Sequence, residues 1–289
     1  MTVERPKPLW LYPNLLSLDA PLVAVAWLYI FSKTWGIWRL GYHPTLTYIT
    51  LALVVWIIYV LDRLLDALMH GKDEVRMQAR HEFHLRHKKK FLAGAGLAAL
   101  VALGFGIFSI PMMIYSYLGV GILLVIGFFA LSIFSNQPPG EISYAKNILA
   151  GSAFAYGTAM IAHMHSGFGG FLELLGSREL MCFAALCILN ILAIDLWEHA
   201  NRYRDLEITA RDELKLTIPL TILAALSLMF ALLDHEFTTR PFYYATLTGA
   251  ALLQVLNRMR PRFSMEALRV LADLAILVPF LIFWGFPMD

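Results

Sequence analysis

The sequence predicts an all-α polytopic membrane protein, a bundle of nine transmembrane helices. Of its 289 residues, 59% are hydrophobic and 15% are charged, and the mean hydropathy is +0.64. Soluble domains contain about 45–50% apolar and about 25% charged residues, so a soluble fold of this size could not bury so much apolar surface. The same composition excludes intrinsic disorder. The net charge of +2 is too small to indicate nucleic acid as a partner.

Nine apolar stretches approach the length of about 20 residues that a helix needs to cross a membrane. They are residues 20–36, 45–69, 91–109, 111–134, 144–164, 179–200, 214–233, 241–257 and 265–286. The first is the shortest and contains Lys33 near its end, so eight spans is the alternative count. Pro111 separates the third and fourth stretches, and residues 135–141 are typical of a turn. Because no linker or low-complexity segment interrupts the chain, we expect one domain over residues 1–289.

The distribution of lysine and arginine predicts the orientation of the spans. If the N-terminus is cytoplasmic, 19 of the 23 Lys and Arg residues lie in segments on the inner side. The outer side keeps Lys33, Arg39, Arg178 and Arg240. No cleavable signal pattern opens the sequence. We therefore expect a multi-pass protein with a cytoplasmic N-terminus, located in a bacterial inner membrane.

Acidic residues gather at the cytoplasmic ends of two predicted spans. The second span ends with Asp62 and Asp66, which are four residues apart and therefore share one helical face. Near the end of the sixth span, Asp195, Glu198, Arg202 and Asp205 fall within a stripe about 80° wide on a continuous helix. Acids near the ends of membrane helices are costly unless they have a partner or a task.

Two such clusters on the same side of a bundle suit a diphosphate that is bound through magnesium. Mg²⁺ prefers oxygen ligands and is usually held by one or two carboxylates together with water and substrate phosphates. Bound Mg²⁺ also neutralises the charge that develops on a departing diphosphate. The alternative is an array of ion pairs at the helix ends, in which Asp62 and Asp66 are solvated or paired with Arg63.

The basic segment 76–90 lies beside these clusters and permits three interpretations. It can be an orientation signal that also contacts anionic lipid headgroups. Alternatively, some of its side chains hold phosphate oxygens; the candidates are Arg80, His84, Arg86 and Lys88. The third interpretation is a metal site made by His81, His84 and His87, although steps of three residues drift by about 60° on a helix and the imidazoles would converge poorly.

The number of spans and the two acidic clusters on one side resemble the UbiA superfamily of intramembrane prenyltransferases. Residues 143–157, which contain Lys146 and Phe154, look like the start of the fifth helix of that family. The stretch 201–207 is similar to the Arg-Asp stretch of its menaquinone-pathway members. The resemblance covers nearly the whole chain in architecture, whereas agreement of specific residues is confined to about 40 positions.

The sequence departs from the family's usual acidic motifs. If Asp62 and Asp66 align with the last two acids of the first motif, Ile58 and Tyr59 stand where Asn and Asp are expected. In the second motif the usual four-residue steps are interrupted, because Arg202 follows Glu198 at that spacing. This chain therefore resembles a divergent member with incomplete aspartate motifs.

The resemblance implies transfer of the isoprenyl group of an isoprenyl diphosphate to a lipid-soluble, often aromatic, acceptor, with Mg²⁺ as the cofactor. The implied catalytic residues are Asp62, Asp66, Glu198 and Asp205, and the metal ligands are these four and Asp195. The implied diphosphate-binding residues are Arg63, Arg80, His84, Lys88, Lys146, Arg202 and Arg204. The implied pocket for the prenyl chain and the acceptor contains Tyr59, Asn147, Phe154 and Asn190.

Two other classes of function stay open at this point. The first is a non-catalytic relative with the same fold, which binds lipid or assembles with partners; the incomplete motifs favour it. The second is a transporter or channel. Against the transporter, no pair of Gly/Pro-broken spans occupies matching positions in two halves of the chain, and the acids lie at helix ends.

Overall fold

The computed structural model describes residues 8–37, 45–69, 79–109, 112–134, 141–167, 169–203, 205–234 and 239–284. In this part of the chain every regular element is a helix. The longer helices are α2 (Asp19–Thr34), α3 (Thr45–Met69), α5 (Lys88–Ser109), α6 (Ile114–Phe134), α7 (Tyr144–His163), α9 (Arg178–Tyr203), α10 (Leu206–Leu233), α11 (Arg240–Met259) and α12 (Met265–Leu277). The shorter ones are η1 (Leu9–Leu11), α1 (Tyr12–Leu15), α4 (Ala79–Arg86), α8 (Phe171–Gly176), η3 (Arg260–Arg262) and α13 (Pro279–Trp284).

Each of the nine predicted stretches contains a helix, but fewer helices meet a strict criterion for crossing a membrane. Among the described residues, α3, α5, α6, α9 and α10 are long and apolar enough to do so. The segments Leu9–Leu15 and Asp19–Thr34 meet the criterion only as a pair bent by 80°, which gives six at most. A helix suits such a sequence because hydrocarbon offers its backbone no hydrogen-bonding partners. The structure therefore confirms that the described part of the chain is all-helical and contains several candidate membrane spans.

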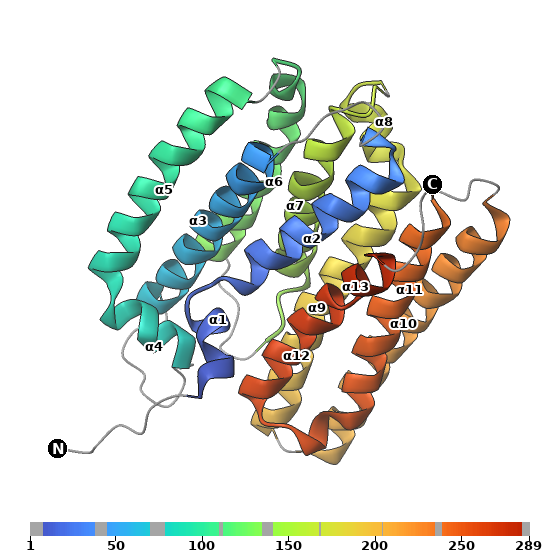
Figure 1. The fold of residues 1–289 in the computed structure, drawn as a ribbon. Coiled ribbons are helices and arrows are strands. Elements are labelled where there is room, and N and C mark those ends of the chain that lie inside the picture. The colour runs from blue at the N-terminus through green and yellow to red at the C-terminus, as the bar shows by residue number, and fades with distance from the viewer. Residues whose placement is uncertain are drawn as a thin grey trace.

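The long helices stand side by side, and successive ones run in opposite directions (Figure 1). Helix α9 lies in the interior: 61% of its apolar window is buried, against 11% for α6. It packs against α7, α10, α11 and α12, while α3 packs against α2 and α5. Helix α10 begins at Leu206, eight residues before the predicted span, so only a short connection separates it from α9. We call the end of the bundle that holds α4 and the ends of α3 and α9 the lower end, as in Figure 1.

The N-terminal segment is broken between α1 and α2. Ser17, which is fully buried, has a φ of 58°, a left-handed conformation that is uncommon for residues other than glycine. The break frees backbone carbonyls, and side chains of α3 satisfy two of them. Trp56 Nε1 donates to the carbonyl of Leu16 at 2.9 Å, and Arg63 donates to the carbonyl of Asn14. Contacts with α3 thus hold the broken N-terminal segment in place.

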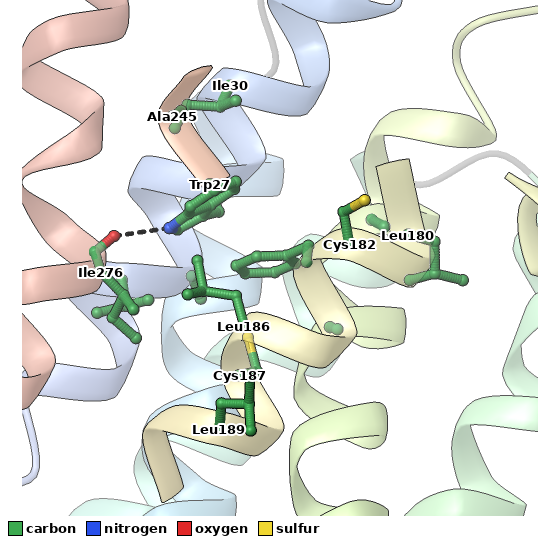
Figure 2. Close-up of a cluster of buried hydrophobic side chains, with 14 of the residues drawn as sticks. Trp27, Ile30, Leu180, Cys182, Leu186, Cys187, Leu189, Ala245 and Ile276 are labelled. Atoms are coloured by element: carbon green, nitrogen blue, oxygen red, sulfur yellow. Dashed lines mark hydrogen bonds between the residues drawn. The ribbon is translucent and has the colours of Figure 1, made fainter. Parts of the chain in front are cut away.

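A second break, between α12 and α13, is satisfied in the same way. Pro279 has no N–H and ends the hydrogen-bond ladder of α12. The last carbonyls of a helix have no intrahelical partner, and Trp27 Nε1 of α2 donates to the carbonyl of Ile276 at 2.7 Å (Figure 2). The Trp27 ring stacks on Phe183 of α9 at a centroid distance of 4.2 Å. This aromatic core joins α2, α9 and α12.

Helices α7 and α9 approach most closely at Gly151. A Cβ atom built on this glycine would lie 2.6 Å from the Ile188 side chain and 2.7 Å from its backbone nitrogen. Only glycine permits this approach without a shift of one helix. The contact matters for function because α7 carries Lys146 and Asn147 one turn before Gly151.

Candidate functional site

Two acidic residues of α3 and a lysine of α7 form an ion-pair group near the lower end of the bundle. Lys146 Nζ lies 3.2 Å from Asp66 Oδ1 and 3.8 Å from Asp62 Oδ1. The three side chains keep between 23% and 25% of their surface exposed. The spacing of Asp62 and Asp66 thus places both carboxylates toward α7, as the sequence predicts for residues that share a helical face.

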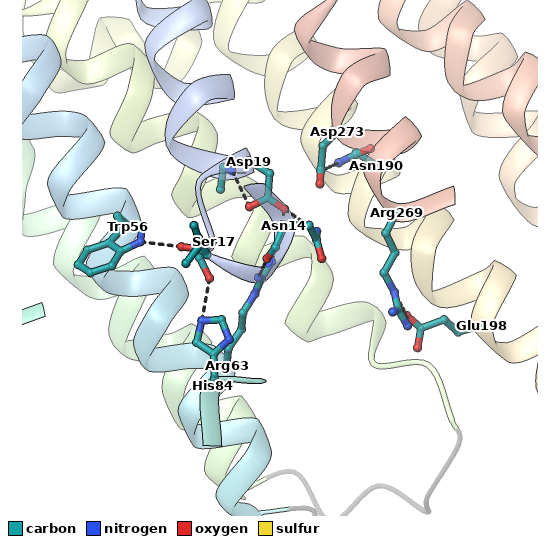
Figure 3. Close-up of polar contacts among 12 residues, drawn as sticks. Asn14, Ser17, Asp19, Trp56, Arg63, His84, Asn190, Glu198, Arg269 and Asp273 are labelled. Carbon is teal, nitrogen blue, oxygen red and sulfur yellow. Dashed lines mark hydrogen bonds and ion pairs between the residues drawn. The ribbon is translucent and has the colours of Figure 1, made fainter. Parts of the chain in front are cut away.

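The acids of α9 have partners on two neighbouring helices. Asn147 Nδ2 of α7 donates to Asp195 Oδ2 at 2.8 Å. The guanidinium of Arg269 on α12 donates to Glu198 Oε1 from Nε at 3.0 Å and from a terminal nitrogen at 2.7 Å (Figure 3). Asp195 therefore lies beside the residue that follows Lys146, and Glu198 faces α12.

We call these groups together the outer polar layer. It consists of Asp62, Asp66, Lys146, Asn147, Asp195, Glu198 and Arg269. Four helices contribute to it, and it combines four carboxylates with two cations. Sequence reasoning selected all of these residues as site candidates except Arg269, which it counted only among the charges that set the orientation.

Arg63 does not join the outer polar layer, although it follows Asp62 directly. Successive residues of a helix point about 100° apart, and the Arg63 side chain turns toward the broken N-terminal segment. Besides its bond to the Asn14 carbonyl, it lies 3.5 Å from Asp19 Oδ2. Asn14 Nδ2 donates to the same oxygen at 2.6 Å. Only 5% of the Arg63 side chain and 10% of the Asp19 side chain are exposed.

Asp273 of α12 and Asn190 of α9 lie beside this buried group (Figure 3). Asn190 Nδ2 donates to Asp273 Oδ1 at 3.4 Å. Tyr59 of α3 lies near Asp19 and Asp273, and its ring meets Phe154 of α7 edge-on at 6.4 Å.

We call this second group the inner polar layer. It consists of Asn14, Asp19, Tyr59, Arg63, Asn190 and Asp273. Sequence reasoning missed Asn14 and Asp19 because they precede the first predicted span, residues 20–36. It did not select Asp273 as a site residue, because nothing in the sequence indicates which helix faces α12.

Of the remaining predicted site residues, His84, Lys88 and Arg202 have described side chains, and none of them belongs to either layer. His84 of α4 is buried, and its Nε2 lies 3.1 Å from Ser17 Oγ. Lys88 is half-buried in the first turn of α5, and Arg202 is exposed at the end of α9. Arg80 lies in α4, but its side chain is outside the description. Arg204 lies outside the described residues.

Asp205 differs from its predicted position. Helix α9 ends at Tyr203, so Asp205 does not continue the stripe of Asp195 and Glu198. It is the exposed N-cap of α10, and its Oδ1 accepts hydrogen bonds from the backbone N–H groups of Glu207 at 2.7 Å and Ile208 at 3.3 Å. The prediction assumed one continuous helix, whereas the chain turns here and uses the carboxylate for capping.

A further group of polar pairs joins α9, α10 and the end of α11. His199 Nδ1 lies 2.6 Å from Asp212 Oδ2, and Arg260 lies 3.6 Å from Glu213. Burial lowers the pKa of Arg260, while Glu213 and Asp212 oppose this change. Because one partner of each pair is almost fully buried, the group holds helix ends together.

The oxygen-rich outer polar layer fits magnesium in its ligand chemistry. Asp62 and Asp66 can provide one or two carboxylates, and Asp195 lies across α7 from them. One or two carboxylates are enough for Mg²⁺ when phosphates and water complete its coordination shell. Within the described ranges, no three His, Cys, Asp or Glu side chains are grouped closely enough to hold an ion by themselves. His84 and His87 of the predicted histidine site have separate partners, Ser17 and the Phe83 carbonyl.

Comparison with known proteins identifies no relative of this chain. No family model, no curated protein and no solved structure matches this chain. The function must therefore be argued from the two polar layers.

Proposed function

We propose that this chain is an intramembrane prenyltransferase, a divergent member of the UbiA superfamily. In this proposal it transfers an isoprenyl group from an isoprenyl diphosphate, with Mg²⁺, to a lipid-soluble acceptor such as an aromatic compound. The observation that carries the proposal is the outer polar layer, in which Asp62 and Asp66 of α3 and Asp195 of α9 converge on the adjacent Lys146 and Asn147 of α7. This combination of carboxylates and a cation at one end of an apolar bundle suits a metal-bound diphosphate.

The proposal includes the topology predicted by the sequence. The nine long helical stretches would each cross the membrane, with the N-terminus and the lower end on the cytoplasmic side of a bacterial inner membrane. Support comes from the positions of the cations: Lys88, Lys146, Arg260 and Arg269 lie toward the lower end, whereas Arg178 and Arg240 begin helices at the opposite end. This asymmetry follows the positive-inside rule.

In the proposed reaction the diphosphate lies in the outer polar layer. There Lys146 and Arg269 donate hydrogen bonds to phosphate oxygens, which are strong because both partners are charged. The chemistry supplied by bound Mg²⁺ is Lewis-acid neutralisation of the charge on the leaving diphosphate. The rings of Tyr59 and Phe154 lie one to two turns deeper and offer aromatic faces to an allylic cation.

A specific observation favours the alternative, a non-catalytic membrane protein of the same fold that binds lipid or assembles with partners. Each acid of the outer polar layer already contacts a cation or an amide of the chain. Lys146 contacts Asp62 and Asp66. Arg269 contacts Glu198, and Asn147 contacts Asp195. Such pairs can hold a bundle together without any ligand. The two candidates differ in what they predict for diphosphate binding.

Thermal unfolding of the detergent-purified protein tests the proposal. We expect geranyl, farnesyl or geranylgeranyl diphosphate to raise the unfolding temperature with Mg²⁺ but not with EDTA. A ligand present at a hundredfold excess over its Kd stabilises the folded state by about 2.7 kcal/mol. The rise should vanish in Asp66→Asn and Glu198→Gln and persist in Glu213→Gln, a matched change at the Arg258 ion pair. No rise with any chain length would support the non-catalytic alternative.

A further inference from the structure

The first helices of the chain, η1 and α1, expose large apolar side chains at the lower end of the bundle. The exposed fractions of Leu9, Trp10 and Tyr12 are 86%, 47% and 40%. Together η1 and α1 form a short arm, which is bent by 80° from α2 and therefore does not continue its direction. An exposed apolar surface of this kind indicates that the arm contacts an apolar or amphipathic partner.

The arm is attached to helix α4. Helix α1 packs against α4, and the two lie side by side at the lower end (Figure 1). Ser17, directly after α1, and His84 of α4 are both fully buried, and their side chains are 3.1 Å apart. The His84 ring stacks on Phe91 of α5 at a centroid distance of 4.1 Å. The apolar side chains of the arm are therefore held beside the start of α5.

Basic side chains gather where α4 meets α5. Arg86 ends α4, and Lys88, Lys89 and Lys90 open α5. Lys89 and Lys90 are exposed, and neither has an ion-pair partner among the described residues. In the stretch 82–92 these four cations are accompanied by one acid, Glu82. This corner of the molecule, which we call the basic corner, therefore has a positive charge that the chain does not neutralise locally.

Helix α5 also shows where the surface of the membrane lies. It is one of the helices that are long and apolar enough to cross a membrane. After Lys90 its exposed side chains become apolar, and Leu92, Leu97 and Leu100 are 44%, 65% and 71% exposed. Because hydrocarbon disfavours charged side chains, the change from lysine to leucine marks the level of the lipid headgroups. The arm packs beside this level, where tryptophan and tyrosine are enriched in membrane proteins.

We propose that the arm and the basic corner form one docking surface for the headgroups of anionic phospholipids. Leu9 and Trp10 enter the boundary between headgroups and acyl chains, and Lys89 and Lys90 contact lipid phosphates. Charge complementarity selects an anionic lipid, because each basic residue near an anionic membrane surface strengthens the interaction by about fivefold. Bound headgroups add to the contacts from α3 that hold the broken N-terminal segment. This inference is independent of the proposed prenyl transfer.

Quenching of Trp10 fluorescence by brominated lipids tests this surface. The full-length protein is placed in nanodiscs that contain equal amounts of phosphatidylcholine and phosphatidylglycerol, and bromine is carried by either one lipid or the other. Comparison with Trp10→Phe isolates the signal of Trp10. We expect brominated phosphatidylglycerol to quench Trp10 more strongly, which corresponds to an enrichment of about fivefold to twentyfold at the arm for one or two lysine contacts. High salt should reduce the enrichment, because salt screens exposed charges.

The double variant Lys89→Gln/Lys90→Gln should reduce the enrichment to about one. The matched control Arg211→Gln/Lys215→Gln removes the same charge from exposed positions on α10 at the same end of the bundle, and it should leave the enrichment intact. All four substituted side chains are exposed, so both variants are expected to fold.

Three results would overturn the proposal. Equal quenching by the two lipids in the wild-type protein would show that the surface does not select anionic headgroups. Enrichment that persists in Lys89→Gln/Lys90→Gln would exclude the two lysines. The absence of quenching by either lipid would place the arm in water, where a soluble partner would have to cover it. The assay contains no diphosphate, so its failure is distinguishable from failure of the proposed function.

Discussion

The two polar layers of this bundle differ in the exposure of their side chains and in the groups that these side chains contact. In the outer polar layer, the side chains of Asp62, Asp66 and Lys146 keep 23–25% of their surface exposed, whereas Asn147 and Arg269 are buried. In the inner polar layer, Arg63 contacts the broken N-terminal backbone, and the exposed fractions of Asn14 and Asn190 are 4% and 5%. The outer groups can exchange partners when a ligand arrives. The inner groups cannot lose a partner without leaving a buried polar atom unsatisfied.

This difference separates stability from binding. Ion pairs that keep about a quarter of their surface exposed, as Lys146 and its two partners do, contribute less to stability than fully buried ones because solvent screens them in part, so this part of the outer polar layer is suited to ligands. A buried charge that loses its partner is strongly destabilising, so the inner polar layer holds α1, α2, α3, α9 and α12 in register. Substitutions in the outer polar layer should therefore mainly weaken ligand binding, and substitutions in the inner polar layer should mainly reduce stability.

The largest effect is expected for Arg63→Met. This change leaves the largely buried Asp19 carboxylate without its cation and removes the donor to the Asn14 carbonyl. We expect a loss of about 3–5 kcal/mol in the free energy of unfolding, measured by thermal unfolding in detergent. Lys146→Met provides the comparison and should cost less than Arg63→Met, because Lys146 and its carboxylate partners keep about a quarter of their surface exposed to solvent. Equal losses for the two variants would remove the distinction between the layers.

Lys146→Met should have its main effect on diphosphate binding. Hydrogen bonds to charged groups contribute about 1.5–3 kcal/mol, which corresponds to a loss of roughly tenfold to a hundredfold in affinity. The measurement is the concentration of farnesyl diphosphate that gives half of the Mg²⁺-dependent stabilisation. Lys215→Met, which removes a partner of Asp212 on α10, should leave this concentration unchanged. An unchanged value in Lys146→Met would exclude Lys146 from the diphosphate site.

Much of the fold could be predicted from the sequence because it depends on local patterns. Residues 45–69 and 144–164 were predicted as spans, and the corresponding helices are Thr45–Met69 and Tyr144–His163. The shared face of Asp62 and Asp66 also follows from spacing alone. Partners on other helices could not be predicted in this way. The pairing of Arg269 with Glu198 and of Asp273 with Asn190 depends on which helices are neighbours, and a single sequence does not specify that.

A smaller effect on stability is expected where the layers depend on close helix packing. Gly151 lies one turn above Asn147, and a Cβ atom there collides with Ile188. Gly151→Ala should therefore cost about 1–3 kcal/mol through overpacking. Gly157 lies on the same helix with nothing within 4 Å of its added Cβ, so Gly157→Ala should be neutral or stabilise by up to about 1 kcal/mol. Thermal unfolding of both variants tests this. Equal losses of stability would show that the close approach of α7 and α9 at Gly151 does not determine the cost of the added methyl group.

The smallest effect is expected at Asp205, where the sequence and the structure assign different roles. As the N-cap of α10, its carboxylate accepts two backbone hydrogen bonds. Replacing a good N-cap with alanine costs about 1 kcal/mol, whereas asparagine caps as well as aspartate does. We therefore expect Asp205→Ala to lose about 1 kcal/mol of stability and Asp205→Asn almost none, with the Mg²⁺-dependent effect of diphosphate intact in both. If Asp205→Asn is stable but no longer responds to diphosphate and Mg²⁺, the residue acts on the metal and α9 must extend through it when the ligand binds.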